Sequence, residues 1–206
     1  MIAINFGSDK QALNTAAEGD LGFVTADGML GAQVPLAKWN NVSGPSGTEV
    51  TVAGAKTETS YLLTYSSPNT WNSQDGNTYN TSIGNLTKGY LDVSNAGGAV
   101  PEISLSGMPT TGYDVAVILS GDGGTFGAVT VNGKDYIGSN GESILGEDSW
   151  GTRQSYDTLA EGQNVIFVKE QSAESLTIVG KRTTNTARAS IAGLMVFFRE
   201  IPDAQD

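Results

Sequence analysis

Three tryptophans carry the clearest potential for chemistry in this sequence, because each lies among small polar residues. Trp39 precedes Asn40 and Asn41, and Trp71 and Trp150 also stand next to asparagine, serine or glycine. A sugar ring offers a flat C–H face on which an indole packs, and a rim of hydroxyls that amide and charged side chains bond. The candidate ligand-binding residues are Trp71, Trp150, Trp39, Asn72, Arg153, Tyr156, Asn40 and Asn41.

A structural role competes with this interpretation for each tryptophan, since an indole in a loop often plugs one end of a hydrophobic core. The apolar run Val34–Ala37, separated from Trp39 by Lys38 alone, favours the structural role there. Trp71 and Trp150 have fully polar surroundings. We therefore expect Trp71 and Trp150 to contribute most to binding, and both roles stay open for Trp39.

Catalysis is not expected. The chain has no histidine and no cysteine, so its acids and bases are carboxylates, lysines and tyrosines. Glycoside hydrolysis needs two carboxylates that face each other across a cleft, and no spacing among the 22 acidic residues singles out such a pair. Tyr156 and Arg153 could serve a lyase, but only their residue types support this. A glycan hydrolase or lyase remains the less favoured alternative.

Metal binding is restricted in the same way. Zinc and transition metals lack their usual histidine and cysteine ligands, and no EF-hand pattern is present. A calcium ion held by oxygen ligands stays open as a structural cofactor. Its ligands would include the early aspartates Asp9, Asp20 and Asp27.

The charge of the chain limits its partners. A net charge of −11 repels phosphate backbones, so we expect no nucleic-acid partner. The longest apolar run, Ile191–Phe198, is far shorter than the ~20 residues of a membrane span, so we expect no membrane insertion.

The elements that must position these residues are predicted to be strands. The 27 glycines, with abundant Thr, Ser and Asn, indicate short strands joined by polar turns. Asn132-Gly133 is the strongest hairpin signal. Long polar loops are expected over 21–46, 66–84 and 138–158, a short helix or a loop over 8–19, and a short helix or strand over 85–92. Strands are predicted at 1–6, 48–52, 59–65, 100–105, 113–120, 127–131, 134–137, 164–169, 175–179 and 189–199.

The strand pattern predicts an all-β fold, an antiparallel β-sandwich of the jelly-roll type. No shift in composition marks a linker, so we predict a single domain with long polar loops over residues 1–200. Residues 201–206 are expected to be a tail or linker stub.

Several short motifs resemble a known fold family. INFG at 4–7 is followed by GYDVAVIL at 112–119, VTVNGKDY at 129–136, ESLTIVG at 174–180 and ASIAGLMVF at 189–197. In this order they resemble the galactose-binding-like jelly rolls, especially malectin-like and other carbohydrate-binding modules. The VPLAKWNN and TWNS stretches are also similar to modules in large secreted proteins of aquatic bacteria. The resemblance implies glycan binding and a structural calcium, while the family's sugar-binding residues sit in variable loops.

These observations lead to one expectation of function and one main alternative. We expect a non-catalytic carbohydrate-binding module, part of a larger multidomain bacterial protein that is secreted or held at the cell surface. Its partner would be a polysaccharide or another glycan. The alternative is a structural or adhesive surface module, or a filament subunit, that binds no glycan.

Overall fold

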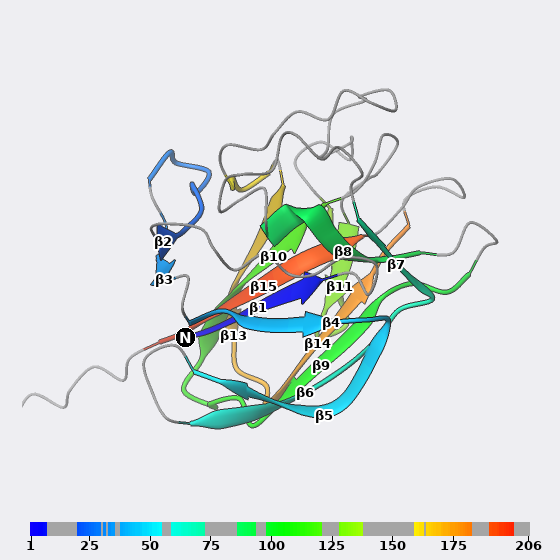
Figure 1. Ribbon diagram of the computed structural model, residues 1–206. Coiled ribbons are helices and arrows are strands. Elements are labelled where there is room, and N and C mark those ends of the chain that lie inside the picture. The colour runs from blue at the N-terminus through cyan, green and yellow to red at the C-terminus, as the bar shows by residue number, and fades with distance from the viewer. Residues whose placement is uncertain are drawn as a thin grey trace, which may run out of the picture.

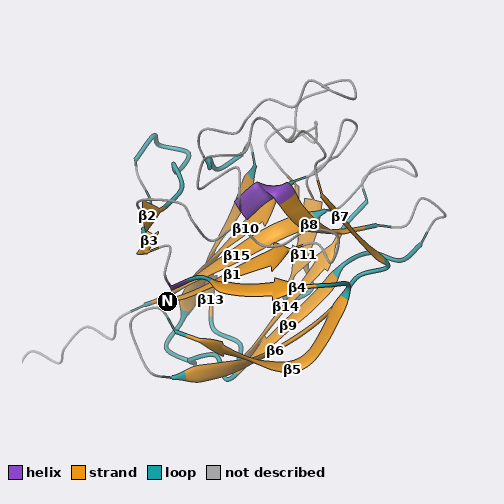
Figure 2. Ribbon diagram, in the orientation of Figure 1, coloured by secondary structure: helices purple, strands orange, loops and turns teal. Residues whose placement is uncertain are grey.

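The computed structural model describes residues 1–7, 20–29, 31, 33–35, 38–54, 59–72, 86–93, 98–120, 128–137, 159–162, 164–182 and 190–199. The expectations for 8–19, most of 66–84, 138–158 and 201–206 lie outside these residues. The described chain is an all-β sandwich of two packed sheets, which confirms the predicted fold class (Figures 1 and 2).

The first sheet has seven strands. Five of them lie in the order β13 (Val165–Gln171), β10 (Tyr113–Leu119), β15 (Ile191–Phe198), β1 (Ile2–Gly7) and β4 (Asn40–Ser43). The other two are β8 (Gly89–Asp92), which pairs with β15, and β7 (Asn69–Asn72), which pairs with β8. The β1–β4 pair is parallel, whereas β1 runs antiparallel to β15.

The second sheet has six strands in antiparallel order. They are β12 (Lys134–Ile137), β11 (Ala128–Val131), β14 (Ser175–Gly180), β9 (Glu102–Ser106), β6 (Ser60–Ser66) and β5 (Ser46–Ala53). A separate two-stranded ribbon consists of β2 (Asp20–Leu21) and β3 (Val34–Pro35).

The inner faces of the two sheets form the main core. In β6 every second side chain is buried, as the period of a half-buried strand requires. Its residue Tyr65 meets Phe6 of β1 across the core, with ring centroids 5.4 Å apart. The predicted hairpin at Asn132-Gly133 is confirmed, because both residues have positive φ, 46° and 80°, as a type I′ turn demands.

The outer faces of the two sheets differ in their exposure to solvent. The six-stranded sheet leaves its outer face largely exposed, where mainly serine and threonine, together with Leu62, Glu102 and Val179, alternate with the buried residues of β6, β9 and β14. In contrast, β1 is buried at all six positions and the first six residues of β15 are buried as well. The outer face of the seven-stranded sheet is therefore also covered.

The cover is a second apolar cluster, which we call the outer layer. Its buried members from outside the sheet strands β1, β10, β13 and β15 are Leu21, Phe23, Val34, Trp39, Leu86, Tyr90 and Leu159. Leu86 stands in a short helical turn over residues 86–88. Gly193 of β15 allows this turn to approach, since an added Cβ would lie 3.3 Å from Leu86 Cδ1 and 3.0 Å from the carbonyl oxygen of Ile4.

Side-chain amides join the two sheets along both of their edges. At one edge Asn40 Nδ2 donates to the carbonyl oxygens of Ala3 and Ala53, and the N–H of Ala53 donates to Asn40 Oδ1. The side-chain amide of Asn40 thus takes the place of a backbone peptide group between β1 and β5. At the other edge Asn132 Nδ2 donates to Gln171 Oε1 over 2.9 Å.

Two segments differ from the sequence expectations, and a third, left open between helix and strand, contains both. The expected loop over 21–46 contains β3 and β4, and the expected loop over 66–84 contains β7. A short helix or a strand is expected over 85–92, and the described residues 86–92 form a helical turn followed by β8. Polar segments such as β4 and β7 become strands because they pair with a neighbouring strand, and the polarity of the sequence does not reveal this pairing.

We predict that replacing Asn40 with alanine destabilises the fold by about 1–3 kcal/mol. The change removes three hydrogen bonds and leaves the backbone groups of Ala53 without their side-chain partner. Urea unfolding of the variant measures the loss. The matched control is Ser60→Ala on the exposed face of β6, for which we expect a change below about 0.5 kcal/mol. Equal stability of Asn40→Ala and the wild type would contradict the proposed link between the sheets.

Candidate functional site

Trp39 lies in the outer layer with 9% of its surface exposed. Its indole packs among apolar side chains over β1 and β15, so it contributes to the core as the apolar run before it suggested. Its ring nitrogen Nε1 is buried and has no hydrogen-bond partner in the described part of the chain.

The two asparagines after Trp39 belong to β4 and have different surroundings. Asn40 is half-buried and forms the link between the sheets described above. Asn41 is exposed, and its Oδ1 accepts a hydrogen bond of 3.0 Å from Asn5 Nδ2. Asn41 Nδ2 in turn donates to the carbonyl oxygen of Trp39 over 3.5 Å.

Trp71 lies on β7 and not in a loop. It pairs with Tyr90 of β8, is half-buried and packs against the outer layer. Asn69 stands two residues earlier, so its side chain is on the same face of the strand as the indole, and it too is half-buried. Asn72 ends β7. Trp150, Arg153 and Tyr156 lie outside the described residues.

The structure brings the two described tryptophans into one layer. The turn after β4 is bonded to the start of the β7–β8 pair, because the N–H of Ser67 donates to the carbonyl oxygen of Pro45 over 2.7 Å. Ser67 Oγ also donates to the carbonyl oxygen of Asp92 over 2.6 Å. Ser67 therefore links the turn after β4 to the end of β8, while Trp39 belongs to the outer layer and Trp71 packs against it. We call Trp39, Asn41, Asn69 and Trp71 the tryptophan surface.

Of the three early aspartates, the structure describes the side chain of Asp27 only. Asp27 is exposed in the turn between β2 and β3, where its Oδ1 accepts hydrogen bonds from Thr25 Oγ1 and from the N–H of Met29. Asp20 begins β2, and Asp9 lies outside the described residues. Within the described ranges no three carboxylates come together in a way that could hold a metal ion.

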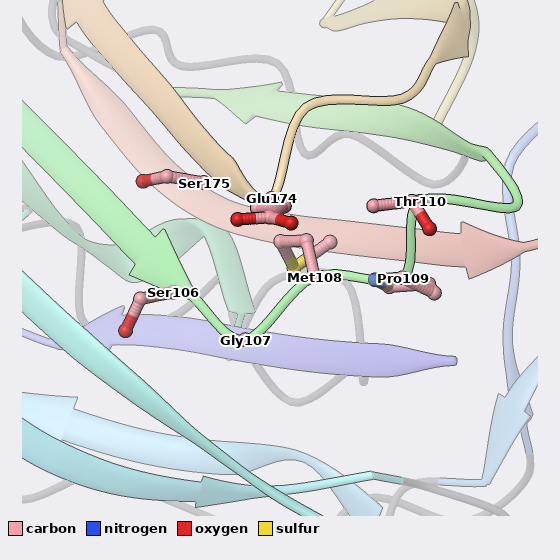
Figure 3. A pocket seen from close by; sticks show the side chains of 7 residues that line it. All are labelled: Ser106, Gly107, Met108, Pro109, Thr110, Glu174 and Ser175. Carbon is pink, nitrogen blue, oxygen red and sulfur yellow. The ribbon is translucent and has the colours of Figure 1, made fainter.

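An open depression of about 590 Å³ lies at the end of the sandwich where β9 ends and β14 begins (Figure 3). Its lining consists of Ser106, Gly107, Met108, Pro109, Thr110, Glu174 and Ser175. The N–H of Met108 donates to the carbonyl oxygen of Glu174 over 3.0 Å, which ties its two walls together. Glu174 is the single carboxylate among the described residues of the lining, which therefore contribute no carboxylate pair of the kind that glycoside hydrolysis needs.

Sequence reasoning missed two polar residues near the tryptophans. Asn5 is 7% exposed and stands in the otherwise apolar strand β1. An amide at a buried strand position is a signal, since buried polar groups need partners and cost stability without them. Asn69 gave no such signal, because the polar residues around it favoured a loop.

Comparison with known proteins adds no relative. No protein family matches the sequence, and neither a curated protein nor a solved structure is significantly similar to it. Among the described residues, no helix has the length and apolar character needed to cross a membrane.

We predict that Asp27 titrates below the ordinary aspartate pKa of 3.8, mainly because Thr25 Oγ1 donates a hydrogen bond to its carboxylate. Replacing Thr25 with valine should raise this pKa, which NMR titration of the Asp27 carboxyl carbon measures. Because the folded-state pKa is lowered, the contribution of Asp27 to stability is present above the unfolded pKa and is lost as the pH falls through the folded value. An unchanged pKa in Thr25→Val would contradict this cause.

Proposed function

We propose that this protein is a non-catalytic carbohydrate-binding module that holds a glycan on the tryptophan surface. The observation that carries the proposal is the position of Trp71, which is half-buried against the outer layer and has the amide of Asn69 on the same face. An aromatic ring beside an amide matches the flat face and the hydroxyl rim of a sugar.

Rigid support makes this surface suited to binding. Trp71 is held by strand pairing on β7 and by packing against the outer layer, so little side-chain freedom remains to be lost when a ligand arrives. Asn41, which is exposed, is oriented by hydrogen bonds to Asn5 and Trp39. Pre-organised groups of this kind bind with less loss of entropy than mobile ones.

We infer that binding is not followed by a reaction. The groups that would contact the ligand are indoles and carboxamides, which neither accept nor release protons near neutral pH. Hydrolysis would need two opposed carboxylates at the bound sugar. Neither calcium nor any other cofactor is required by the contacts that we assign.

We place the module in a larger secreted or surface protein of a bacterium. The support is the cysteine-free, acidic composition and the motif order that resembles galactose-binding-like jelly rolls. A β-sandwich of two packed sheets, the fold class of the described chain, is compatible with this resemblance.

The proposal predicts that soluble neutral polysaccharides retard the protein in an affinity gel, and that Trp71→Ala weakens the retardation about tenfold or more. The free energy lost with one aromatic contact, about 1.4 kcal/mol, corresponds to a tenfold loss of affinity. Trp71→Phe keeps part of the packing and should retain part of the affinity. Met29→Ala, which shortens a side chain that is 66% exposed on the β2–β3 turn, should bind like the wild type.

Circular dichroism and urea unfolding separate lost binding from lost folding in these variants. A wild-type protein that no polysaccharide retards would overturn glycan binding and favour the structural or adhesive module. Retardation that survives in folded Trp71→Ala would exclude Trp71 as the platform.

A further inference from the structure

The first observation is that Asn5 and Trp39 both lie on the outer side of the seven-stranded sheet, where Trp39 clusters with Ala3, the residue two positions before Asn5 on β1. Asn5 of β1 lies opposite Asn41 of β4 in the parallel register, and their side chains are hydrogen-bonded. Trp39 immediately precedes β4, two residues before Asn41, and its indole is buried in the outer layer on this side of the sheet.

The second observation is that each of these residues has a buried polar atom without a partner. Asn5 is 7% exposed and Trp39 is 9% exposed. Asn5 Oδ1 and Trp39 Nε1 both lack a hydrogen-bond partner among the described residues. The amide oxygen only accepts hydrogen bonds, whereas the indole N–H only donates them, so one missing group could serve both.

The orientation of the amides follows from the same network. The carbonyl oxygen of Trp39 accepts from Asn41, which requires Asn41 Nδ2 to point toward it. Asn41 Oδ1 then faces Asn5 and accepts from Asn5 Nδ2. Asn5 Oδ1 is thereby the atom left over. An exchange of its oxygen and nitrogen would place two acceptors against each other.

We propose that Trp39 Nε1–H and Asn5 Oδ1 together bind one hydroxyl oxygen, which accepts from the indole and donates to the amide. A carboxylate or phosphate would be repelled by Asn5 Oδ1, and an ammonium group could not accept from the indole. The fitting chemistry is therefore an uncharged O–H group. Its source is a bound water or a hydroxyl of a sugar that enters beside the exposed Asn41. The second source rests on the proposed glycan binding.

NMR of the indole N–H groups in the intact chain tests the proposal. The Trp39 resonance is identified by its loss in Trp39→Phe. We measure its magnetisation transfer from water, and its shift on addition of neutral hexasaccharides of glucose, xylose, mannose and galactose. Transfer from a long-lived water supports the site with water as its occupant. A shift with a hexasaccharide supports the site with a sugar hydroxyl as its occupant. The absence of both the transfer and the shift overturns the proposal.

The variant Asn5→Leu keeps the size of the side chain and removes the acceptor. We expect the Trp39 indole proton to move upfield and to lose both effects, while a Ser60→Ala control leaves it unchanged. An indole resonance that is the same in folded Asn5→Leu and in the wild type overturns the joint role. If Asn5→Leu does not fold, a high-resolution crystal structure of the wild type decides. It must show an oxygen about 2.7–3.2 Å from both atoms.

The two proposals can fail separately. Retardation by polysaccharide in the affinity gel tests glycan binding as a whole and does not depend on Asn5. A protein that binds glycan but shows neither indole effect loses only the hydroxyl site. A protein that binds no glycan but shows transfer from a long-lived water retains the site and loses the proposed function.

Discussion

Burial of the seven-stranded sheet on both faces is the constraint on which the rest of this structure depends. Its central strands carry apolar residues at successive positions, so each of them presents a hydrophobic surface away from the other sheet as well. If that surface were exposed to water, the fold would lose about 25 cal/mol of stabilising free energy for every Å² left uncovered. Segments outside the sheet must therefore lie on it, and these segments build the outer layer.

The need for a cover explains where the two described tryptophans are found. Trp39 closes the layer over β1, and Trp71 packs against it from the β7–β8 pair. Each indole therefore contributes to packing, and only the part of its surface that packing leaves accessible can contact a ligand. A binding surface made in this way is rigid, and changes to it affect stability and affinity together.

Parts of the fold could be predicted because the signals were local. Leu176 and Ile178 alternate with exposed residues in β14, and Asn132-Gly133 requires a type I′ turn whatever surrounds it. The pair Asn40-Asn41 shows where local reasoning ends. It falls within the loop expected over 21–46, but it lies in β4 because this segment pairs with β1, which is distant in sequence. The Asn40 amide then bonds to β1 and β5. The half-buried position of Trp71 likewise depends on β8, whose pairing no local pattern predicts.

Hydrogen–deuterium exchange of the protein with and without a polysaccharide that retards it tests the central claim most directly. If the outer layer is the binding surface, the ligand should slow exchange in β4 and in the β7–β8 pair, over residues 39–43, 69–72 and 89–92. Exchange at the open depression, over 106–110 and 174–175, should not change. Protection confined to the depression, or to the exposed serine and threonine face of the six-stranded sheet, would contradict the account.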